Sequence, residues 1–490
     1  MFHRWTVTTA ALALLASPAL AAQDTITLGM VLEPPSLDPT GNAAAAIDEV
    51  VYANVFEGLT KFGSDGAILP ALASSWDVED DGKTYVFHLH EGVKFHDGAD
   101  FNADDVVFTL DRARAEDSTN PQKTLFEGIA SVEAVDPVTV RVSLSAPDGL
   151  FPFKMAWGDA VMLDEASVGN EATQPVGTGP FKFTEWRQGD SIRLDAFDGY
   201  WGDKPALQTA TFRFIGDPTA AFAAVMAGDV DAFPIYPSPE TLAQLEADPR
   251  FKVIVGTTEG ETILTMNKAV PPLDNVKVRE AIAHAINRQE IIDGALFGYG
   301  TPIGTHFAPH HPDYVDLTEK SAYDPEMAKA LLAEAGVENL TLRLALPPTP
   351  YARRGGELLA AQLRAVGIET EATNMEWAQW LETVYKGKDY DLTIISHVEP
   401  MDIGIYTRDD YYFNYSNDAL KAVMSEVNTT TDDAQRSELL KQAQTLIADD
   451  FVNAYLFQLA KTGVANAKVE GLWENAPTPA NDLSQVHWTE

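Results

Sequence analysis

The chain has 490 residues, of which 45% are hydrophobic and 22% are charged, an ordinary composition for a folded protein of several domains. Against 34 Lys and Arg stand 73 Asp and Glu, a formal net charge of −39, which disfavours binding to nucleic acid and to anionic membrane surfaces. Cysteine does not occur, which excludes disulfides, thiolate metal sites, iron–sulfur clusters and cysteine nucleophiles.

The first 22 residues have the layout of a cleavable secretory signal. A short basic start at Arg4 is followed by an apolar run and by small residues that end at Ala21 and Ala22. A membrane anchor is disfavoured, because a span needs roughly 20 apolar residues and this run is shorter and interrupted by Pro18. With no cysteine to carry a lipid, we expect a signal peptide 1–22 and a mature protein that is free in the periplasm.

Strand and helix patterns alternate along the mature chain. Residues 85–89 and 138–144 alternate apolar and polar side chains, which predicts half-buried strands. Between them, Asn102 has the position of a helix N-cap, and Asp105 stands three residues later, where its carboxylate can complete a capping box.

Three further helices are predicted in the second half of the chain. Apolar residues recur at spacings of three and four within 278–286. A second helix opens at Asp324 and closes at Gly336, and a third spans 357–366 and ends at Gly367. This alternation of strands and helices indicates an α/β architecture with mixed sheets.

No motif of a known catalytic or cofactor site is assembled by the sequence. His306, His310 and His311 lie between two prolines in a predicted loop, where a metal site is one interpretation. Coordination normally needs three or four converging ligands, so we expect these histidines to be exposed to solvent and assign no metal ligand. A nucleophile, a base and an oxyanion donor are not brought together, which favours a binding protein over an enzyme, with no catalytic residue and no cofactor.

Several blocks along the chain follow the order of a known family. They are 72–76 (LASSW), 91–98 (EGVKFHDG), 177–183 (GTGPFKF), 200–202 (YWG), 225–231 (VMAGDVD), 278–282 (VREAI), 323–328 (YDPEMA) and 363–368 (LRAVGI). In these blocks the chain resembles family 5 solute-binding proteins, the periplasmic receptors of peptide- and nickel-type ABC importers.

The resemblance implies a bilobed α/β periplasmic-binding-protein fold with mixed sheets, a hinge between the lobes and an extra inserted domain. The first lobe would combine 23–58, 168–258 and 470–490, the inserted domain would be 59–167, and the second lobe 259–469. Such a protein would act as a monomer that captures a small peptide or peptide-like solute in the interlobe cleft. It would deliver that solute to permease subunits in the inner membrane.

The resemblance also implies ligand-binding residues. In the dipeptide-binding branch an arginine ahead of the helix ending in Val-Gly holds the ligand carboxylate, and Arg353 and Arg354 stand at that place. A guanidinium fork suits a carboxylate geometrically, although ion pairs at the surface are an alternative role. An aspartate of that branch holds the ligand amino group, and Glu399 lies near its position, with Asp402 as a second candidate.

Other candidates flank these residues. They are His397, Trp377 and Tyr406, which starts a segment, 406–415, dense in aromatic and acidic residues. This segment would form a wall of the pocket or pack in the core, since aromatic side chains bury large areas in either role. Peptide-binding members usually carry Gly-Trp where this chain has Ile395 and Ser396. An oligosaccharide, a nickel chelate or another cationic organic solute is therefore the alternative ligand, and a secreted hydrolase is a remote alternative.

Overall fold

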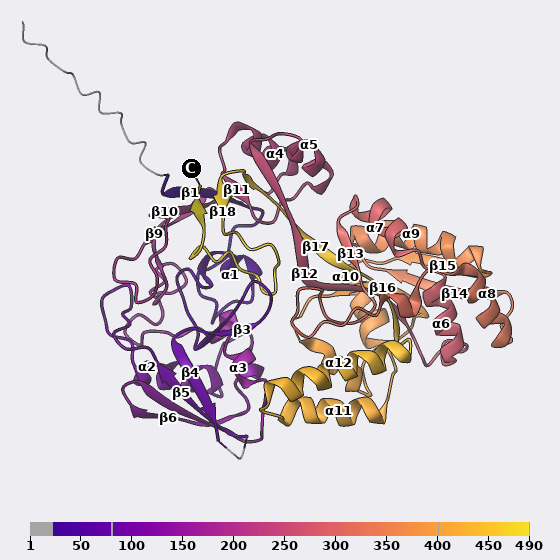
Figure 1. Ribbon diagram of the computed structural model, residues 1–490, viewed down its shortest axis with the longest axis horizontal. Coiled ribbons are helices and arrows are strands. Elements are labelled where there is room, and N and C mark those ends of the chain that lie inside the picture. The colour runs from indigo at the N-terminus through magenta and orange to yellow at the C-terminus, as the bar shows by residue number, and fades with distance from the viewer. Residues whose placement is uncertain (1–22, 80–81, 400, 490) are drawn as a thin grey trace, which may run out of the picture.

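The computed structural model describes residues 23–79, 82–399 and 401–489. The predicted signal peptide, residues 1–22, lies outside the described residues. In the part of the chain that is described, no helix combines the length and the apolar character needed to cross a membrane. Figure 1 shows two lobes, an indigo and violet one that also carries the C-terminal end, and an orange one, as the predicted bilobed α/β fold requires.

One mixed sheet runs through both lobes. Among the described residues it has eleven strands, in the order β15-β14-β16-β12-β17-β11-β1-β10-β9-β8, with β13 paired to β17. Pairing is parallel between β14 and both β15 and β16, and between β1 and both β10 and β11. The strands are β1 (Thr25–Met30), β8 (Phe181–Arg187), β9 (Ser191–Ala196), β10 (Thr209–Phe214), β11 (Ala232–Phe233), β12 (Phe251–Met266), β13 (Gly300–Pro302), β14 (Leu340–Leu346), β15 (Ile368–Asn374), β16 (Leu392–His397) and β17 (Asn453–Asn466).

The long antiparallel strands β12 and β17 cross from one lobe to the other (Figure 1). Their register shifts between Thr257, which is opposite Ala460, and Glu261, which is opposite Gln458. Four steps along β12 thus match two steps along β17, which defines a β-bulge at residues 258–260. A bulge bends its strand and re-aims the neighbouring side chains, so it places Glu261 at the junction between the lobes.

A separate four-stranded sheet, β4-β5-β7-β6, lies in the violet part of the indigo and violet lobe, which is called the violet body below (Figure 1). Strands β5 (Thr84–Leu89) and β7 (Thr139–Leu144) confirm the two predicted strands, and β4 (Ala73–Val78) and β6 (Ile129–Asp136) pair with them. Helix α2 (Ala103–Arg114) has the predicted capping box. Asp104 N donates to the Asn102 side chain at 2.8 Å, and Asn102 N donates to the Asp105 carboxylate at 2.9 Å.

The predicted helices of the second lobe are present, and one of them is longer than expected. Helices α6 (Val276–His284) and α8 (Pro325–Glu334) match the predictions, but α9 (Pro350–Ala365) begins at Pro350 rather than at 357. Two glycines, poor helix formers, obscured its first turns in the sequence. Gly356 allows close packing, because a Cβ there would lie 2.7 Å from the Leu346 side chain of β14, and a Cβ on Gly355 would lie 3.3 Å from the Ile291 side chain. Arg353 and Arg354 therefore lie within the helix and not ahead of it.

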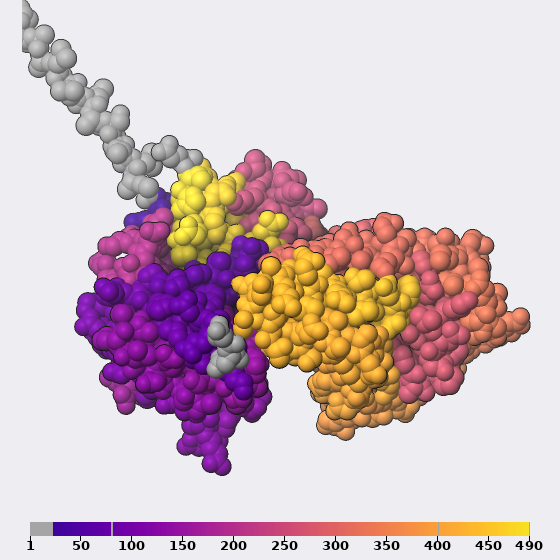
Figure 2. Space-filling model, turned by 60° about the horizontal axis from the view of Figure 1, so that its bottom comes forward, coloured from indigo at the N-terminus to yellow at the C-terminus, as the bar shows by residue number. Residues whose placement is uncertain are grey.

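Shorter elements and the remaining helices complete the fold, and Figure 2 shows the gold segment that contains α11 and α12 beside the violet body. A hydrogen bond joins these two parts, since Gly149 N, just ahead of α3, donates to Asn428 O of α11 at 2.9 Å. These elements are α1 (Ala45–Val51), α3 (Phe151–Lys154), α4 (Pro218–Ala227), α5 (Leu242–Glu246), α7 (Arg288–Leu296), α10 (Trp377–Trp380), α11 (Asp418–Thr429), α12 (Asp433–Asp449), β2 (Thr60–Phe62), β3 (Ile68–Pro70), β18 (Val469–Glu470), β19 (His487–Trp488), 3-10 turns η1 (Lys123–Leu125), η2 (Gly158–Ala160), η3 (Pro239–Thr241), η4 (Thr318–Ser321) and η6 (Asp402–Thr407), and a π-helical turn η5 (Leu381–Lys386).

A buried carboxylate, Glu57, joins distant segments of the first lobe and the violet body. It accepts hydrogen bonds from Thr178 Oγ1 at 2.8 Å and from Tyr200 OH and Trp201 Nε1 at 3.0 Å each. Burial raises the pKa of Glu57, and these three hydrogen bonds oppose that shift by stabilising the ionised form. The blocks 177–183 and 200–202 therefore contribute packing and hydrogen bonds around one buried acceptor.

Candidate functional site

The carboxyl ends of β14, β15 and β16 meet at one edge of the sheet in the orange lobe. β14 leads into α9, β15 into α10 and β16 into η6. In open α/β sheets, ligands bind in the crevice outside the carboxyl ends of parallel strands. The predicted ligand-binding residues follow these three strand ends, although they are far apart in the sequence: Arg353 and Arg354 on α9, Trp377 on α10, and Glu399 and Asp402 after β16.

The two arginines face different neighbours. Arg353 Nη2 donates to Glu376 Oε1 at 2.9 Å and more weakly to Met375 O at 3.4 Å, in the loop after β15. Its Nε is buried and has no hydrogen-bond partner among the described residues. The Arg354 guanidinium instead lies 5.6 Å from the centre of the Phe297 ring, at the end of α7. Arg353 is thus the arginine directed toward the strand ends.

Two of the predicted residues offer open surface at this edge. Trp377 is 43% exposed, and its ring packs edge-on against that of Trp380, with the centres 5.9 Å apart. Glu399 is exposed as well. An indole and a carboxylate that are both accessible suit the apolar and the cationic parts of a solute respectively.

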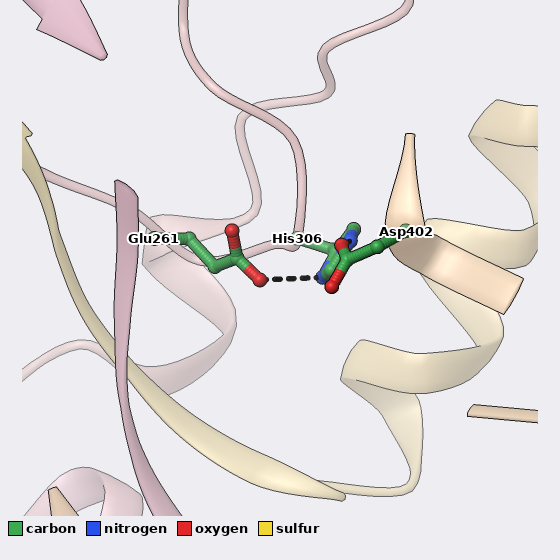
Figure 3. A group of neighbouring side chains, drawn as sticks. All are labelled: Glu261, His306 and Asp402. Atoms are coloured by element: carbon green, nitrogen blue, oxygen red, sulfur yellow. Dashed lines mark ion pairs between the residues drawn. The ribbon is translucent and has the colours of Figure 1, made fainter. Parts of the chain in front are cut away.

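Asp402 and His397 belong to a buried polar cluster instead, and Figure 3 shows Asp402 beside His306 and Glu261. His306 lies between two carboxylates, with its Nδ1 3.1 Å from Glu261 Oε1 and its Nε2 2.7 Å from Asp402 Oδ1. His397 Nδ1 is 3.3 Å from the other Asp402 oxygen, and His397 Nε2 is 3.1 Å from Tyr412 OH. Glu261 carries no sequence signal of this role, since it stands within a strand of mixed polar and apolar residues.

The two carboxyl groups of this cluster are shifted in opposite directions. Burial raises the pKa of Asp402, but the charges and hydrogen bonds of His306 and His397 together lower it more, so it ends well below its usual range. Burial, and next the charge of Asp402, raise the pKa of Glu261 well above its usual range. Asp402 has two histidine partners, His306 and His397, whereas Glu261 has only His306 among the described residues.

The expectation that His306, His310 and His311 are exposed to solvent is wrong. His306 is 3% exposed and contacts Glu261, and the His310 side chain is equally buried, with its Nε2 2.8 Å from Glu259 Oε1. His311 stacks on a phenylalanine ring at 4.4 Å. The loop after β13 packs on the bulge of β12, a contact between distant segments that local sequence patterns do not encode.

Tyr406 and the aromatic segment that follows it lie in the core of the orange lobe. Tyr406 is 1% exposed, its hydroxyl lies 3.0 Å from Tyr455 OH, and Asn453 Nδ2 donates to it at 3.2 Å. The aromatic residues at 411, 412, 413 and 415 are at most 8% exposed. Core packing therefore describes this segment in the present arrangement, and a ligand contact by Tyr406 stays a prediction.

A cavity of about 310 Å³ lies where the violet body faces the orange lobe. Its walls come from both sides, with Trp76 and Phe153 on one and His311, Met401 and Arg436 on the other. Figure 2 shows the surface hollowed between these two parts of the molecule. Met401 precedes Asp402, so this cavity adjoins the segment that carries the buried cluster.

Comparisons with known proteins agree on one family. The profile of the bacterial extracellular solute-binding proteins, family 5, matches residues 67–418. The dipeptide-binding protein of Escherichia coli K12 is 31% identical over 459 residues, covering 85% of each chain. The glutathione-binding protein GsiB of Pectobacterium atrosepticum is 35% identical over 387 residues, covering 77% of this chain and 74% of its own.

Solved structures share the fold over nearly the whole chain. HbpA2 of Haemophilus parasuis has a TM-score of 0.88 at 23% identity, covering 95% of this chain and 100% of its own. The murein tripeptide-binding protein MppA, in its unliganded open form, has a TM-score of 0.86 at 22% identity over 96% and 98%. The oligopeptide-binding protein AppA of Bacillus subtilis, in complex with a nonapeptide, has 0.70 at 25% identity over 96% and 100%.

Proposed function

This chain belongs to family 5 of the bacterial extracellular solute-binding proteins, and on that premise we propose that it captures a small peptide or peptide-like solute between its lobes. It would act in the periplasm, without catalysis, and hand the solute to the permease of an ABC importer. Its lobes would be 23–58 with 168–258 and 470–490, and 259–469, and the inserted domain would be 59–167. Relatives named for dipeptides and glutathione support a ligand with both a carboxylate and an amino group.

The observation that carries this proposal is the Arg353 side chain at the carboxyl edge of the sheet, which is 40% exposed although its Nε is buried. Its Nη2 is directed to the loop after β15, and the exposed part of the guanidinium is suited to bind a carboxylate. Glu399 offers an exposed carboxylate for a ligand ammonium, and Trp377 offers an aromatic face. His397, Asp402 and Tyr406 would support this wall from beneath.

The arrangement of the lobes supports capture by closure. At equal coverage of this chain, the TM-score is 0.86 with an unliganded open form and 0.70 with a peptide complex. A ligand shifts the equilibrium of an open receptor toward the closed state only to the extent that it binds the closed state more tightly than the open state. Closure removes water from the ligand, so each of its polar groups requires a protein partner.

Isothermal titration calorimetry of the mature protein against dipeptides, tripeptides, glutathione, oligosaccharides and nickel chelates tests this function. We expect a carboxylate-bearing peptide to bind, and Arg353→Ala to weaken it by about 10- to 100-fold, the effect of one or two hydrogen bonds to a charged group. Arg364→Ala is the matched control, because Arg364 lies on the same helix and pairs with Glu369 at 3.0 Å. Wild-type affinity in Arg353→Ala would remove carboxylate recognition from the proposal, and turnover of the peptide would contradict a non-catalytic role.

A further inference from the structure

The buried cluster of Glu261, His306 and Asp402 is held by ion pairs between its own members, but several of its polar atoms lack well-oriented hydrogen bonds. Glu261 is 2% exposed and His306 is 3% exposed. Glu261 Oε1, His306 Nδ1 and Asp402 Oδ1 are buried atoms that make no well-oriented hydrogen bond within the described residues, although they face one another (Figure 3). Such atoms are rare in folded proteins, and three in one cluster indicate a place for a ligand.

The charge of the cluster indicates the sign of that ligand. Within the described residues, the ion pairs of Glu261 and Asp402 are with histidines: His306 contacts both carboxylates, and His397 contacts Asp402. The neighbouring Glu259 adds a third carboxylate, which pairs with His310. None of these three carboxylates has a Lys or Arg partner within the described residues, and buried carboxylates are usually paired with a cation or bound to a metal.

The donor set indicates the kind of cation. One ligand atom from each of Glu261, His306 and Asp402 lies within 4.8 Å of the other two. Ligands bound to one tetrahedral Zn²⁺ at about 2.0–2.2 Å lie about 3.3–3.6 Å apart, so the ligand atoms have to close in by about 1 Å. Glu261 and Asp402 face different nitrogens of His306, so one carboxylate has to turn toward the nitrogen that binds the ion. Imidazole combined with carboxylates suits Zn²⁺ and related transition metals, whereas Mg²⁺ and Ca²⁺ take oxygen ligands.

We propose that Glu261, His306 and Asp402 form a binding site for a divalent transition metal ion of the zinc class. The ligands come from the crossing strand β12, the loop after β13 and the turn η6 that follows β16. His397 contacts the second Asp402 oxygen at 3.3 Å and is the positioning residue for that carboxylate. The bound ion joins the junction of the lobes to the edge of the sheet, and its binding does not depend on the proposed solute.

The test uses mature protein that has been stripped with EDTA and then titrated with ZnCl₂ in millimolar Mg²⁺, which occupies weak surface sites. We expect one equivalent of Zn²⁺ to bind, and Co²⁺ to give a visible absorption band at the same stoichiometry. His306→Gln and, independently, Glu261→Gln should each abolish that equivalent. His397→Gln should weaken it by about 10- to 100-fold, as is usual for residues that orient a metal ligand.

His311→Gln is the matched control, because His311 lies on the same loop but outside the cluster, and it should bind Zn²⁺ as the wild type does. Circular dichroism of each metal-free variant separates loss of the ion from loss of the fold. Glu261→Gln is nearly isosteric and covers the case in which His306→Gln does not fold. Absence of a tight equivalent in the wild type, or its persistence in both ligand variants, would overturn the proposal. Arg353→Ala should leave Zn²⁺ binding unchanged, so this site and the proposed solute site can fail separately.

Discussion

Replacing Glu57 by alanine is expected to destabilise the protein more than any typical surface substitution. The carboxylate is the common acceptor for Thr178 Oγ1, Tyr200 OH and Trp201 Nε1, at 2.8 to 3.0 Å. Glu57 itself is 8% exposed, so little water is available to replace it. The substitution leaves three donors without their acceptor and also opens a small void.

The magnitude follows from the fate of these donors. A buried donor that loses its partner costs about 1–3 kcal/mol. The two hydroxyl groups can rotate toward other acceptors, whereas the Trp201 indole N–H is fixed, so we expect a total loss of about 3–5 kcal/mol. Unfolding entropy of about 2.1 cal/mol/K per residue amounts to roughly 1 kcal/mol/K for a chain of this length. The melting temperature should therefore fall by about 3–5 °C if the chain unfolds as one unit.

Differential scanning calorimetry and urea denaturation measure this loss, with Glu33→Ala as the matched control. Glu33 also accepts a hydrogen bond from an indole, Trp186 Nε1, at 2.9 Å, but this bond is exposed to solvent. Water can replace that carboxylate, so the control should change stability by about 0.5 kcal/mol or less. Equal effects of the two substitutions would refute the reasoning, because burial is the property that distinguishes the two sites.

Three further predictions concern stability. Asn102→Ala should cost about 1 kcal/mol in urea denaturation because α2 loses its cap, and an unchanged midpoint would contradict the capping box. Arg279→Lys should lower the free energy of unfolding by at least about 2 kcal/mol, since the buried guanidinium donates to four main-chain carbonyls that an ammonium group cannot reach together. Full stability of this variant in urea denaturation would show that those hydrogen bonds are dispensable. Burial raises the pKa of Asp159 to about 7, so its contribution is present at low pH and is lost as the pH rises through 7. The wild type should therefore lose up to about 4 kcal/mol relative to Asp159→Asn between pH 4 and pH 8, and parallel pH profiles of the two proteins would contradict this.

Local patterns predicted the elements that depend on local physics. The alternation of residues 85–89 and 138–144 matches β5 and β7, because one face of each strand is buried and the other is less so. The capping box of α2 and the termini of α8 were readable because their hydrogen bonds join residues two to four apart. The start of α9 was not predicted, since two glycines weaken its helical pattern and their close packing against Ile291 and Leu346 is a tertiary contact.

The candidate site was predictable only in part, for the same reason. Arg353, Trp377 and Glu399 come from separate segments, and the parallel pairing of three strands places them at one edge. His306 is buried against Glu261, which follows the bulge of β12. Neither His306 nor Glu261 carries a local sequence signal of that contact. The segment 406–415 left pocket wall and core both open, because large aromatic side chains suit either role, and its aromatic residues are buried in the structure.

The sheet shared by the two lobes has a mechanical consequence. The backbone ladder between β12 and β17 is continuous from Phe251 to Thr257 and, after a second register shift between Thr262 and Ile263, again to Thr265. Each of these two parts is anchored in its own hydrophobic interior. Rotation about the backbone dihedral angles of residues 258–260 would move one lobe relative to the other without breaking the ladder hydrogen bonds or repacking either hydrophobic interior. The energy of such a rotation would then be set by the facing surfaces of the lobes, through their hydration and their few direct contacts such as the hydrogen bond from Gly149 N to Asn428 O. A solute that makes a small number of additional contacts could therefore shift the balance between the two arrangements.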